Sequence, residues 1–344
     1  MEPESDERYS ERYSRQMLFA AIGREGQQRL LQSRVAIVGC GATGSALASL
    51  LARAGVGTLR IIDRDYVEAS NLQRQVLFDE ADAADSLPKA IAACRKIASF
   101  NSQIVAEPFV RDLRPENANE LLAGIDLILD GTDNFETRYL VNDYAVKNSF
   151  PWIYVAAVAA YAITMNIIPR ETACLSCVFP ESPRGAIETC ETAGILNSAV
   201  NFAASIAATE AIKLLTGNTQ QLRRTLLSHD LWLNQYAEVS ADKPQPDCRT
   251  CGRKEFVHLA GEGRHRITLC GRNSVQIHEH DRPIDLGEMS ARLKPHGDVR
   301  HNDFVLKFWK EPFEMTLFSD GRAIIKGTTD TAVARSLYAR YVGS

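Results

Sequence analysis

The sequence predicts an α/β fold: a doubly wound, Rossmann-like, mostly parallel sheet, followed by a small C-terminal α+β domain. Short apolar runs alternate with helical patterns through the first 150 residues, as in parallel sheets. The first apolar run leads into a glycine-rich turn at residues 39–44, and the second ends in an acid, Asp63. From about residue 255 the pattern becomes an alternation of apolar and polar residues, which is typical of half-buried strands.

Composition limits the class of protein. The chain has 344 residues, enough for two domains, with 45% hydrophobic and 24% charged residues. Its net charge of −4 and lack of a basic stripe lead us to expect no nucleic-acid partner. No apolar run reaches the ~20 residues of a membrane helix, so we expect no membrane partner and a cytoplasmic location. Residues 1–10 are acidic and predict a disordered tail before domains at 11–254 and 255–344.

The elements of the first domain follow from periodicity, glycines and prolines. A helical stretch at 8–31 precedes the first strand. A polar loop at 71–78 follows the strand that ends at Asp63. The next helix begins at Pro88, which occupies its first turn. The strands expected are 34–38, 58–63, 104–107, 126–130, 152–156, 162–168, 225–233 and 235–239, and the helices are 44–54, 88–99, 115–122, 135–148 and 194–215.

The second domain is expected to be α+β because helical stretches flank its alternating segments. Its strands are predicted at 266–269, 275–278, 304–309, 314–318 and 323–325, and its helices at 286–293 and 331–341.

The glycine turn indicates a nucleotide. Gly39, Gly41 and Gly44 permit a tight turn and a close backbone approach, and the helix that follows offers free N–H groups to an anion. Asp63 lies 19 residues after Gly44, where a carboxylate can bind a ribose hydroxyl. Dehydrogenases and adenylating enzymes both use this pattern, so the turn alone does not choose between them.

The loop after Asp63 favours a triphosphate. Asn71, Gln73 and Arg74 offer several donors, and Lys89 follows 15 residues after Arg74. These cations and amides suit a triphosphate better than a dinucleotide, whose pyrophosphate is served largely by the helix N-terminus. The alternatives are a surface salt bridge for Arg74 and a solvated first-turn position for Lys89.

Asp133 is the candidate Mg²⁺ ligand. It follows the buried strand 126–130 and so lies at a carboxyl edge, where open α/β sheets bind ligands. A carboxylate beside phosphates can hold Mg²⁺. The alternative for Asp133 is an N-cap of the next helix, and Asp130 is a second candidate whose alternative role is structural.

The cysteines divide into three groups. Cys174, Cys177, Cys248 and Cys251 form two C-x-x-C pairs 70 residues apart, the spacing of a structural zinc site, with free thiols or redox pairs as the alternative. Cys190 lies in a polar loop before a predicted helix, where a lowered thiol pKa suits covalent capture of an acyl group, and an inert cysteine is the alternative. We expect core positions for the remainder, which are Cys40, Cys94 and Cys270.

Together these residues resemble the ThiF/MoeB family, bacterial relatives of ubiquitin-activating enzymes. The resemblance covers about residues 12–252. It is carried by Arg12-Tyr13-Ser14-Arg15-Gln16, the glycine turn, Asp63, Ser70-Asn71-Leu72-Gln73-Arg74-Gln75, Lys89, Thr132-Asp133-Asn134, the paired C-x-x-C and Cys190-Glu191-Thr192-Ala193-Gly194.

The resemblance implies adenylation, with pyrophosphate release, of the C-terminal glycine of a ubiquitin-like sulfur carrier such as ThiS or MoaD. It implies a carrier ending in Gly-Gly, a homodimer, thiamine or molybdopterin biosynthesis, and a cysteine desulfurase as a further partner. The implied site roles are ribose binding by Asp63, close packing of Gly41 on the nucleotide, phosphate binding by Asn71, Arg74 and Lys89, Mg²⁺ binding by Asp133, triphosphate contact by Arg15 of the partner subunit, and the crossover-loop cysteine for Cys190.

Two features depart from the family pattern. Ala42 replaces a glycine that many members carry, and the sequence around Cys270 lacks the rhodanese loop of some relatives, so we predict no sulfurtransferase activity from it. Three other functions remain open. They are an NAD-dependent oxidoreductase using a histidine from the last third of the chain, a tRNA-modifying dehydratase of the same superfamily, and a non-catalytic scaffold.

Overall fold

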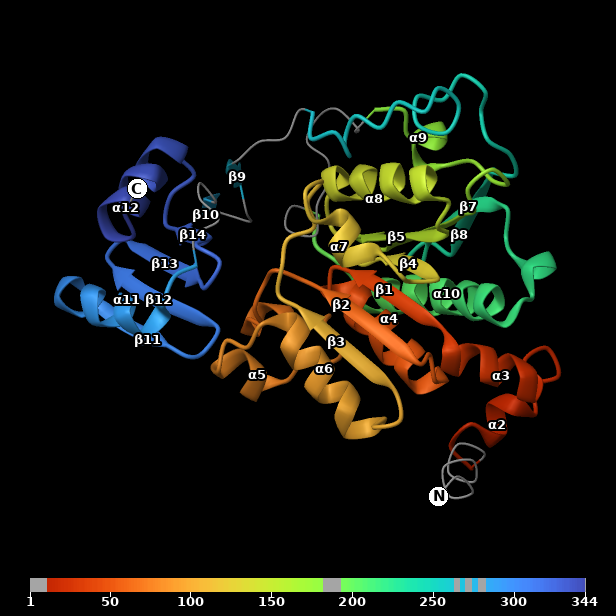
Figure 1. The fold of residues 1–344 in the computed structure, drawn as a ribbon, viewed down its shortest axis with the longest axis horizontal. Helices are drawn as coiled ribbons and strands as arrows, with labels where there is room; N and C mark the ends of the chain where they lie inside the picture. Colours follow the sequence, from red (N-terminus) through yellow and green to blue (C-terminus); the bar gives the residue numbers. More distant parts are fainter. Residues whose placement is uncertain (1–10, 182–192, 263–266, 270–273, 278–282, 344) are drawn as a thin grey trace. The chain divides into compact units, whose positions relative to one another are not determined.

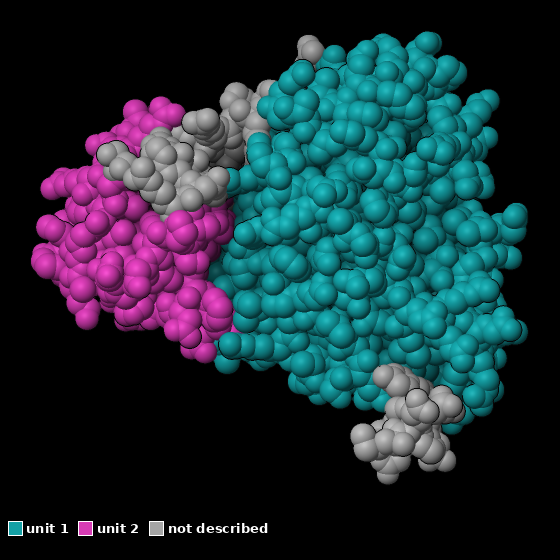
Figure 2. All heavy atoms as spheres, viewed as in Figure 1, with its two compact units in different colours: residues 1–84, 88–262 teal, residues 85–87, 263–344 magenta. Residues whose placement is uncertain are grey.

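The computed structural model describes residues 11–181, 193–262, 267–269, 274–277 and 283–343. The predicted tail at 1–10, Cys190 and Cys270 lie outside these ranges. The chain forms two compact units, shown in separate colours in Figure 2. One comprises Met1–Ala84 and Pro88–Glu262, and the other comprises Asp85–Leu87 and Gly263–Ser344.

The first unit is built on an eight-stranded sheet with the order β3-β2-β1-β4-β5-β6-β7-β8 (Figure 1). Strands β1 to β5 pair in parallel, and β5 to β8 pair antiparallel. The mostly parallel Rossmann-like sheet is therefore confirmed. The strands are β1 (Arg34–Val38), β2 (Thr58–Ile62), β3 (Val105–Phe109), β4 (Leu127–Asp130), β5 (Trp152–Val158), β6 (Tyr161–Ile167), β7 (Thr225–Asp230) and β8 (Gln235–Ser240).

Helices cover both faces of this sheet. Helices α4, α6 and α10 pack on one face, and α7 and α8 pack on the other (Figure 1). The helices are α2 (Ser14–Met17), α3 (Gly23–Gln32), α4 (Ala42–Ala54), α5 (Glu80–Ala84), α6 (Lys89–Phe100), α7 (Ala118–Leu122), α8 (Phe135–Asn148), α9 (Leu175–Val178) and α10 (Asn197–Thr216), with 3-10 turns η1 (Ala69–Asn71) and η2 (Thr219–Gln221). Within the described ranges, none is long and apolar enough to cross a membrane.

Two predicted helices have different bounds. The stretch predicted at 8–31 is split into α2 and α3, because Gly23 has a left-handed φ of +58° and the chain turns there. The helix predicted from residue 194 begins at Asn197. The preceding residues pair with the β5–β6 turn instead, since Gly194 accepts a hydrogen bond from the Ala159 N–H and Leu196 donates one to the Ala159 carbonyl.

The register of the sheet gathers three strand ends at one edge. Val38, the last residue of β1, pairs with Ile62 of β2 and with Asp130 of β4. The residues that follow, including Gly39 and Asp63, therefore emerge side by side. The strand order reverses between β1 and β4, and such a switch point is where open α/β sheets bind ligands.

Three glycines make this edge sterically possible. Gly39 has a φ of +86°, and its carbonyl oxygen lies so close to Gly44 and Gly131 that a Cβ on either would overlap it. Gly41 is different, since its φ of −77° suits any residue and the nearest atoms to a Cβ there would be Gln75 Nε2 at 3.9 Å and Gly131 O at 4.0 Å. The chain itself therefore needs no glycine at position 41.

The second unit is a six-stranded antiparallel sheet with the order β11-β12-β13-β14-β10-β9. Helices α11 and α12 pack with the apolar residues of the strands to form its core, which confirms the α+β class. Strand β11, whose side chains are mostly exposed, escaped prediction because it has no apolar alternation. The elements are β9 (Ile267–Leu269), β10 (Ser274–Ile277), α11 (Leu286–Leu293), η3 (Lys294–His296), β11 (Asp298–His301), β12 (Val305–Lys310), β13 (Phe313–Phe318), β14 (Ala323–Lys326) and α12 (Thr331–Tyr341).

Substituting Gly131 by alanine should lower the free energy of unfolding by about 3 kcal/mol, because its Cβ would overlap a backbone carbonyl that cannot rotate away. Gly41→Ala, which meets no such overlap, should change that free energy by about 0.5 kcal/mol or less. Urea unfolding of both variants measures the difference. Equal stabilities would contradict the role assigned to the close glycine approach.

Candidate nucleotide site and thiol cluster

Asp63 is held rigidly at the end of β2. Its carboxylate accepts hydrogen bonds from the N–H groups of Cys40 and Asp65, each at 2.6 Å. The side chain is buried, and burial raises its pKa above the ordinary range, although Lys89 acts in the opposite direction. The bond from Cys40 ties the acid directly to the glycine turn, so the two predicted nucleotide-binding features are adjacent.

Lys89 is the buried cation of this edge. It is the first residue of α6 and only 8% exposed, so the alternative of a solvated first-turn lysine is wrong. Its Nζ lies 3.4 Å from Asp65 Oδ2. Burial lowers the pKa of Lys89, but the carboxylates of Asp65, Asp63 and Asp133 outweigh it and raise the pKa above its usual value. The ammonium group therefore stays charged at neutral pH.

The loop after Asp63 is ordered by its own hydrogen bonds. Asn71 is buried, and its side-chain oxygen accepts the Glu68 N–H at 3.2 Å in a capping box that closes η1. Its amide NH₂ has no hydrogen-bond acceptor among the described residues. Arg74 donates to the Ser70 carbonyl at 2.9 Å and has no carboxylate partner in the described chain, which contradicts a surface salt bridge. Gln73 is exposed to solvent.

Asp133 lies in the exposed turn between β4 and α8. The N-cap of α8 is Asn134, whose side chain accepts the Thr137 N–H at 2.8 Å, so the N-cap alternative for Asp133 is wrong. Asn134 also donates to the Asp133 carboxylate at 3.4 Å, a long hydrogen bond. The carboxylate is thus left accessible, and it is one of the acids whose charge raises the pKa of Lys89.

Asp130 has a structural role. Its carboxylate accepts Arg138 Nε at 2.8 Å and the Thr132 N–H at 2.8 Å. Arg138 is buried and also donates to the carbonyls of Thr132 and Val155, at 2.7 and 3.2 Å. This network fixes the turn that carries Asp133. Neither Arg138 nor Gly131 is predicted from the sequence above. The signal for Arg138 is a cation in the first turns of a helix that follows a buried acid.

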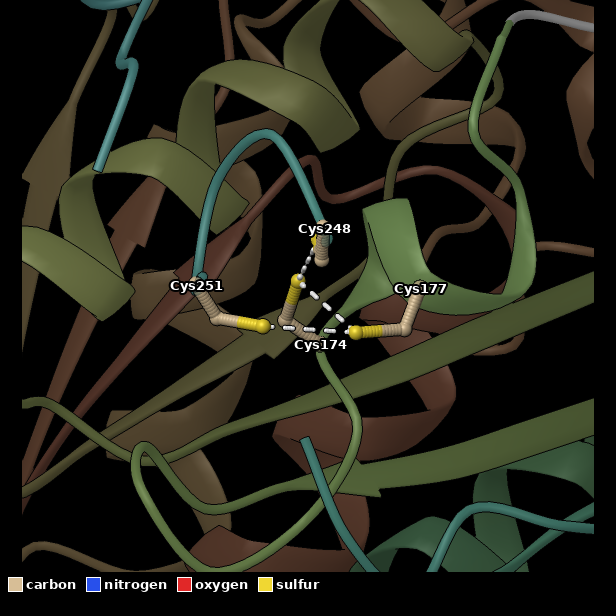
Figure 3. A group of neighbouring side chains, drawn as sticks. All are labelled: Cys174, Cys177, Cys248 and Cys251. Carbon is tan, nitrogen blue, oxygen red and sulfur yellow. Dashed lines mark hydrogen bonds between the residues drawn. The ribbon is translucent and has the colours of Figure 1, made fainter. Parts of the chain in front are cut away.

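The four predicted zinc ligands come together, as Figure 3 shows. Their sulfur atoms all lie within 4.8 Å of one another, with Cys174 Sγ 3.6 Å from Cys248 Sγ and Cys177 Sγ 3.3 Å from Cys251 Sγ. The thiols are free. Four sulfurs placed tetrahedrally around zinc at ~2.3 Å would be ~3.8 Å apart, so the donor set fits a zinc ion. No other such group was found among the described residues.

Helix α8 holds the two turns of the thiol cluster through hydrogen bonds. Asn142 accepts the Leu175 N–H at 2.9 Å and lies 3.7 Å from Cys174 Sγ. Asp143, also on α8, accepts the Thr250 hydroxyl at 3.1 Å and the His258 N–H at 2.9 Å. Both C-x-x-C turns are therefore hydrogen-bonded to one helix. These bonds orient the thiols toward one another even when no metal is bound.

Arg15 is displayed by a firmly anchored segment. Tyr13 is buried over Gly55 and accepts a hydrogen bond from Asn101, and Gln16 donates to the Ala54 carbonyl at 2.8 Å. Arg15 itself is exposed and contacts none of the site residues above. Among the cysteines expected in the core, Cys40 is buried and Cys94 is half-buried.

These features define a class of protein: a Rossmann-like fold with a glycine turn, a cationic loop and an accessible carboxylate at the switch point. The chain belongs to the ThiF family, whose family model matches residues 13–250.

Several known proteins are similar over most of the chain. A sulfur carrier protein ThiS adenylyltransferase of Bacillus subtilis is 44% identical, covering 96% of this chain and 99% of that protein. A sulfur carrier protein adenylyltransferase of Thermus thermophilus is 35% identical, covering 70% of this chain and 90% of its own length. The crystal structure of E. coli MccB with MccA-N7isoASN shares the fold, with a TM-score of 0.62 and 24% identity over 71% of this chain and 74% of that one.

Proposed function

We propose that the protein is an ATP-dependent adenylyltransferase that activates the C-terminal glycine of a ubiquitin-like sulfur carrier. The observation that carries this proposal is the buried Lys89 beside Asp63 and Asp133 at the switch point. A dinucleotide needs no such cation, because the helix N-terminus serves its pyrophosphate. The similar adenylyltransferases from Bacillus subtilis and Thermus thermophilus support the same reaction.

The reaction follows from the arrangement of the edge. Asp63 holds the ribose, Gly41 admits the phosphates, and a carrier carboxylate oxygen attacks the α-phosphorus of ATP. The bond between the α-phosphorus and the bridging oxygen breaks, and pyrophosphate leaves with its charge offset by Lys89, Arg74 and the amide of Asn71. The carrier becomes an acyl-adenylate, which a sulfur donor then consumes.

Asp133 would hold Mg²⁺. Its carboxylate is exposed and, within the described ranges, accepts one long hydrogen bond, from Asn134, so it is available as a ligand. A single carboxylate suits this ion, which takes its other ligands from water and phosphate oxygens. When bound, Mg²⁺ neutralises phosphate charge.

Arg15 would act in a homodimer. It is exposed on α2 and followed by Leu18 and Phe19, which are 74% and 64% exposed. Such apolar side chains beside a charged one are typical of an interface that a second copy covers. Arg15 would then contact the triphosphate bound to the partner subunit.

The carrier's sulfur would serve thiamine biosynthesis. The Bacillus subtilis relative, which carries the ThiS name, favours thiamine over molybdopterin biosynthesis. A cysteine desulfurase would supply the sulfur, and Cys190 would take part in its transfer. The free thiols of the described chain suit the reducing cytoplasm. No observation here favours a tRNA-modifying dehydratase or an oxidoreductase.

Asp133→Ala should reduce pyrophosphate–ATP exchange with a diglycine-ending carrier by about 100-fold or more, because a charge-stabilising group is lost at the phosphates. The measurement is radiolabel exchange at saturating ATP. Asp242→Ala, which alters an exposed acid after β8, should exchange like the wild type. A wild-type rate for Asp133→Ala would exclude the assigned role.

The thiol cluster should contain one zinc ion per chain. Cys248→Ser should lose most of the zinc and lower the thermal midpoint by about 10 °C, since the metal ties two distant turns together. Metal analysis and calorimetry test this expectation. Cys94→Ala, a half-buried cysteine of α6, should retain the metal. A fully loaded Cys248→Ser protein would contradict the assignment.

Mixed dimers test the action of Arg15 across subunits. Arg15→Ala and Asp133→Ala chains are each expected to be inactive alone. When they are co-expressed with different tags, purified dimers that contain both should regain one intact site of two and give about half of wild-type exchange activity. If Arg15 served its own subunit, both sites of the mixed dimer would be defective and no activity would return.

A further inference from the structure

One buried side-chain amide at the candidate nucleotide site, that of Gln75, makes no hydrogen bond to any described residue. Gln75 is only 3% exposed, and its Oε1 is buried without a hydrogen-bond partner. The NH₂ group of the same side chain also has no hydrogen-bond partner among the described residues. The backbone of Gln75 is bonded on both sides: its N–H donates to the Asn71 carbonyl at 3.0 Å, and its carbonyl accepts the Phe78 N–H at 3.2 Å. A buried amide without partners costs about 1–3 kcal/mol. Its oxygen stays buried, whereas its NH₂ end is free to donate to a ligand.

The amide of Gln75 faces the glycine turn. Its Nε2 lies 3.9 Å from the position that a Cβ on Gly41 would occupy, and Gly131 O at 4.0 Å is the other neighbour of that position. Gly41 is the N-cap of α4, and no side chain caps this helix. The space over Gly41 therefore has the free N–H groups of a 13-residue helix below it and an unpaired amide beside it.

We propose that Gln75 is a nucleotide-binding residue whose side-chain NH₂ donates a hydrogen bond to a phosphate oxygen of ATP seated over Gly41. An anion above a helix N-terminus is bound by hydrogen-bond donors. The amide of Gln75 therefore presents its NH₂ group, not its oxygen, to the ligand. This inference rests on the proposed function, and it adds a contact that the loop's exposed glutamine, Gln73, does not provide in this structure.

The geometry of the loop explains why Gln75 is the buried glutamine. The capping box of Glu68 and Asn71 winds the chain into η1, and the Gln75 N–H continues that winding by bonding to Asn71. Leu77 and Phe78, which are both buried, then fix the chain on the far side. The side chain of Gln75 is thus directed inward toward the turn before any ligand binds.

The test replaces Gln75 by leucine, which keeps the size and removes the amide. In calorimetric titration with Mg·ATP, Gln75→Leu should raise Kd about 10-fold or more, the loss expected for one hydrogen bond to a charged group. Gln75→Glu should bind more weakly still, because its carboxylate repels phosphate. The thermal midpoint of ligand-free Gln75→Leu should be equal to or above that of the wild type, since an unpaired buried group is removed. A purely structural role predicts a lower midpoint and an unchanged Kd.

Gln103→Leu is the matched control. Gln103 also has a buried oxygen without a partner, but it precedes β3 at the opposite edge of the sheet, so its substitution should leave the Kd for ATP unchanged. A wild-type Kd for Gln75→Leu would overturn the inference, as would equal weakening by the control. If the wild type binds ATP without exchanging pyrophosphate with any carrier, while Gln75→Leu binds weakly, the proposed function fails and the inference holds.

Discussion

The nucleotide edge depends on one steric constraint, the absence of Cβ atoms where three backbone segments meet. The Gly39 carbonyl can lie against Gly44 and Gly131 only because none of them has a side chain. This contact brings the first turn of α4, which follows β1, against the turn that follows β4. Asp63 then reaches the Cys40 N–H, and Asp133 reaches the neighbourhood of Lys89. Without this contact the phosphate-binding turn and the acid would be separate features.

Helix α8 connects this edge to the thiol cluster. Its N-terminal residues hold the Asp133 turn, through the Asn134 cap and the Arg138 network. Its middle residues hold both C-x-x-C turns, through Asn142 and Asp143. A metal bound by the thiols would therefore stabilise the same helix that positions the candidate magnesium ligand, although it lies apart from the nucleotide site. Such shared support explains how a structural ion can matter to a reaction in which it takes no part.

Local sequence patterns predicted the fold class, the glycine turn, Asp63, Lys89, Asp133 and the grouping of four cysteines, because each depends on residues close in sequence or on a metal-ligand spacing. Non-local requirements escaped prediction. The need for glycine at position 131 arises only when β4 is placed beside β1. The burial of Gln75 depends on the capping box of η1. The structural role of Asp130 depends on its bond to Arg138. The sequence pattern of the helix does not reveal that Arg138 is buried.

The surroundings of Lys89 have a consequence for which form of the nucleotide the protein can accept. One buried ammonium faces the carboxylates of Asp63, Asp65 and Asp133, so acids outnumber the buried cation before any ligand arrives. A polyanion that entered alone would add repulsion in a region where water screens charge poorly. A ligand that carries its own counter-charge would meet less of this repulsion. If a nucleotide binds at this edge, we therefore expect its occupancy to depend on the divalent cation concentration as well as on shape.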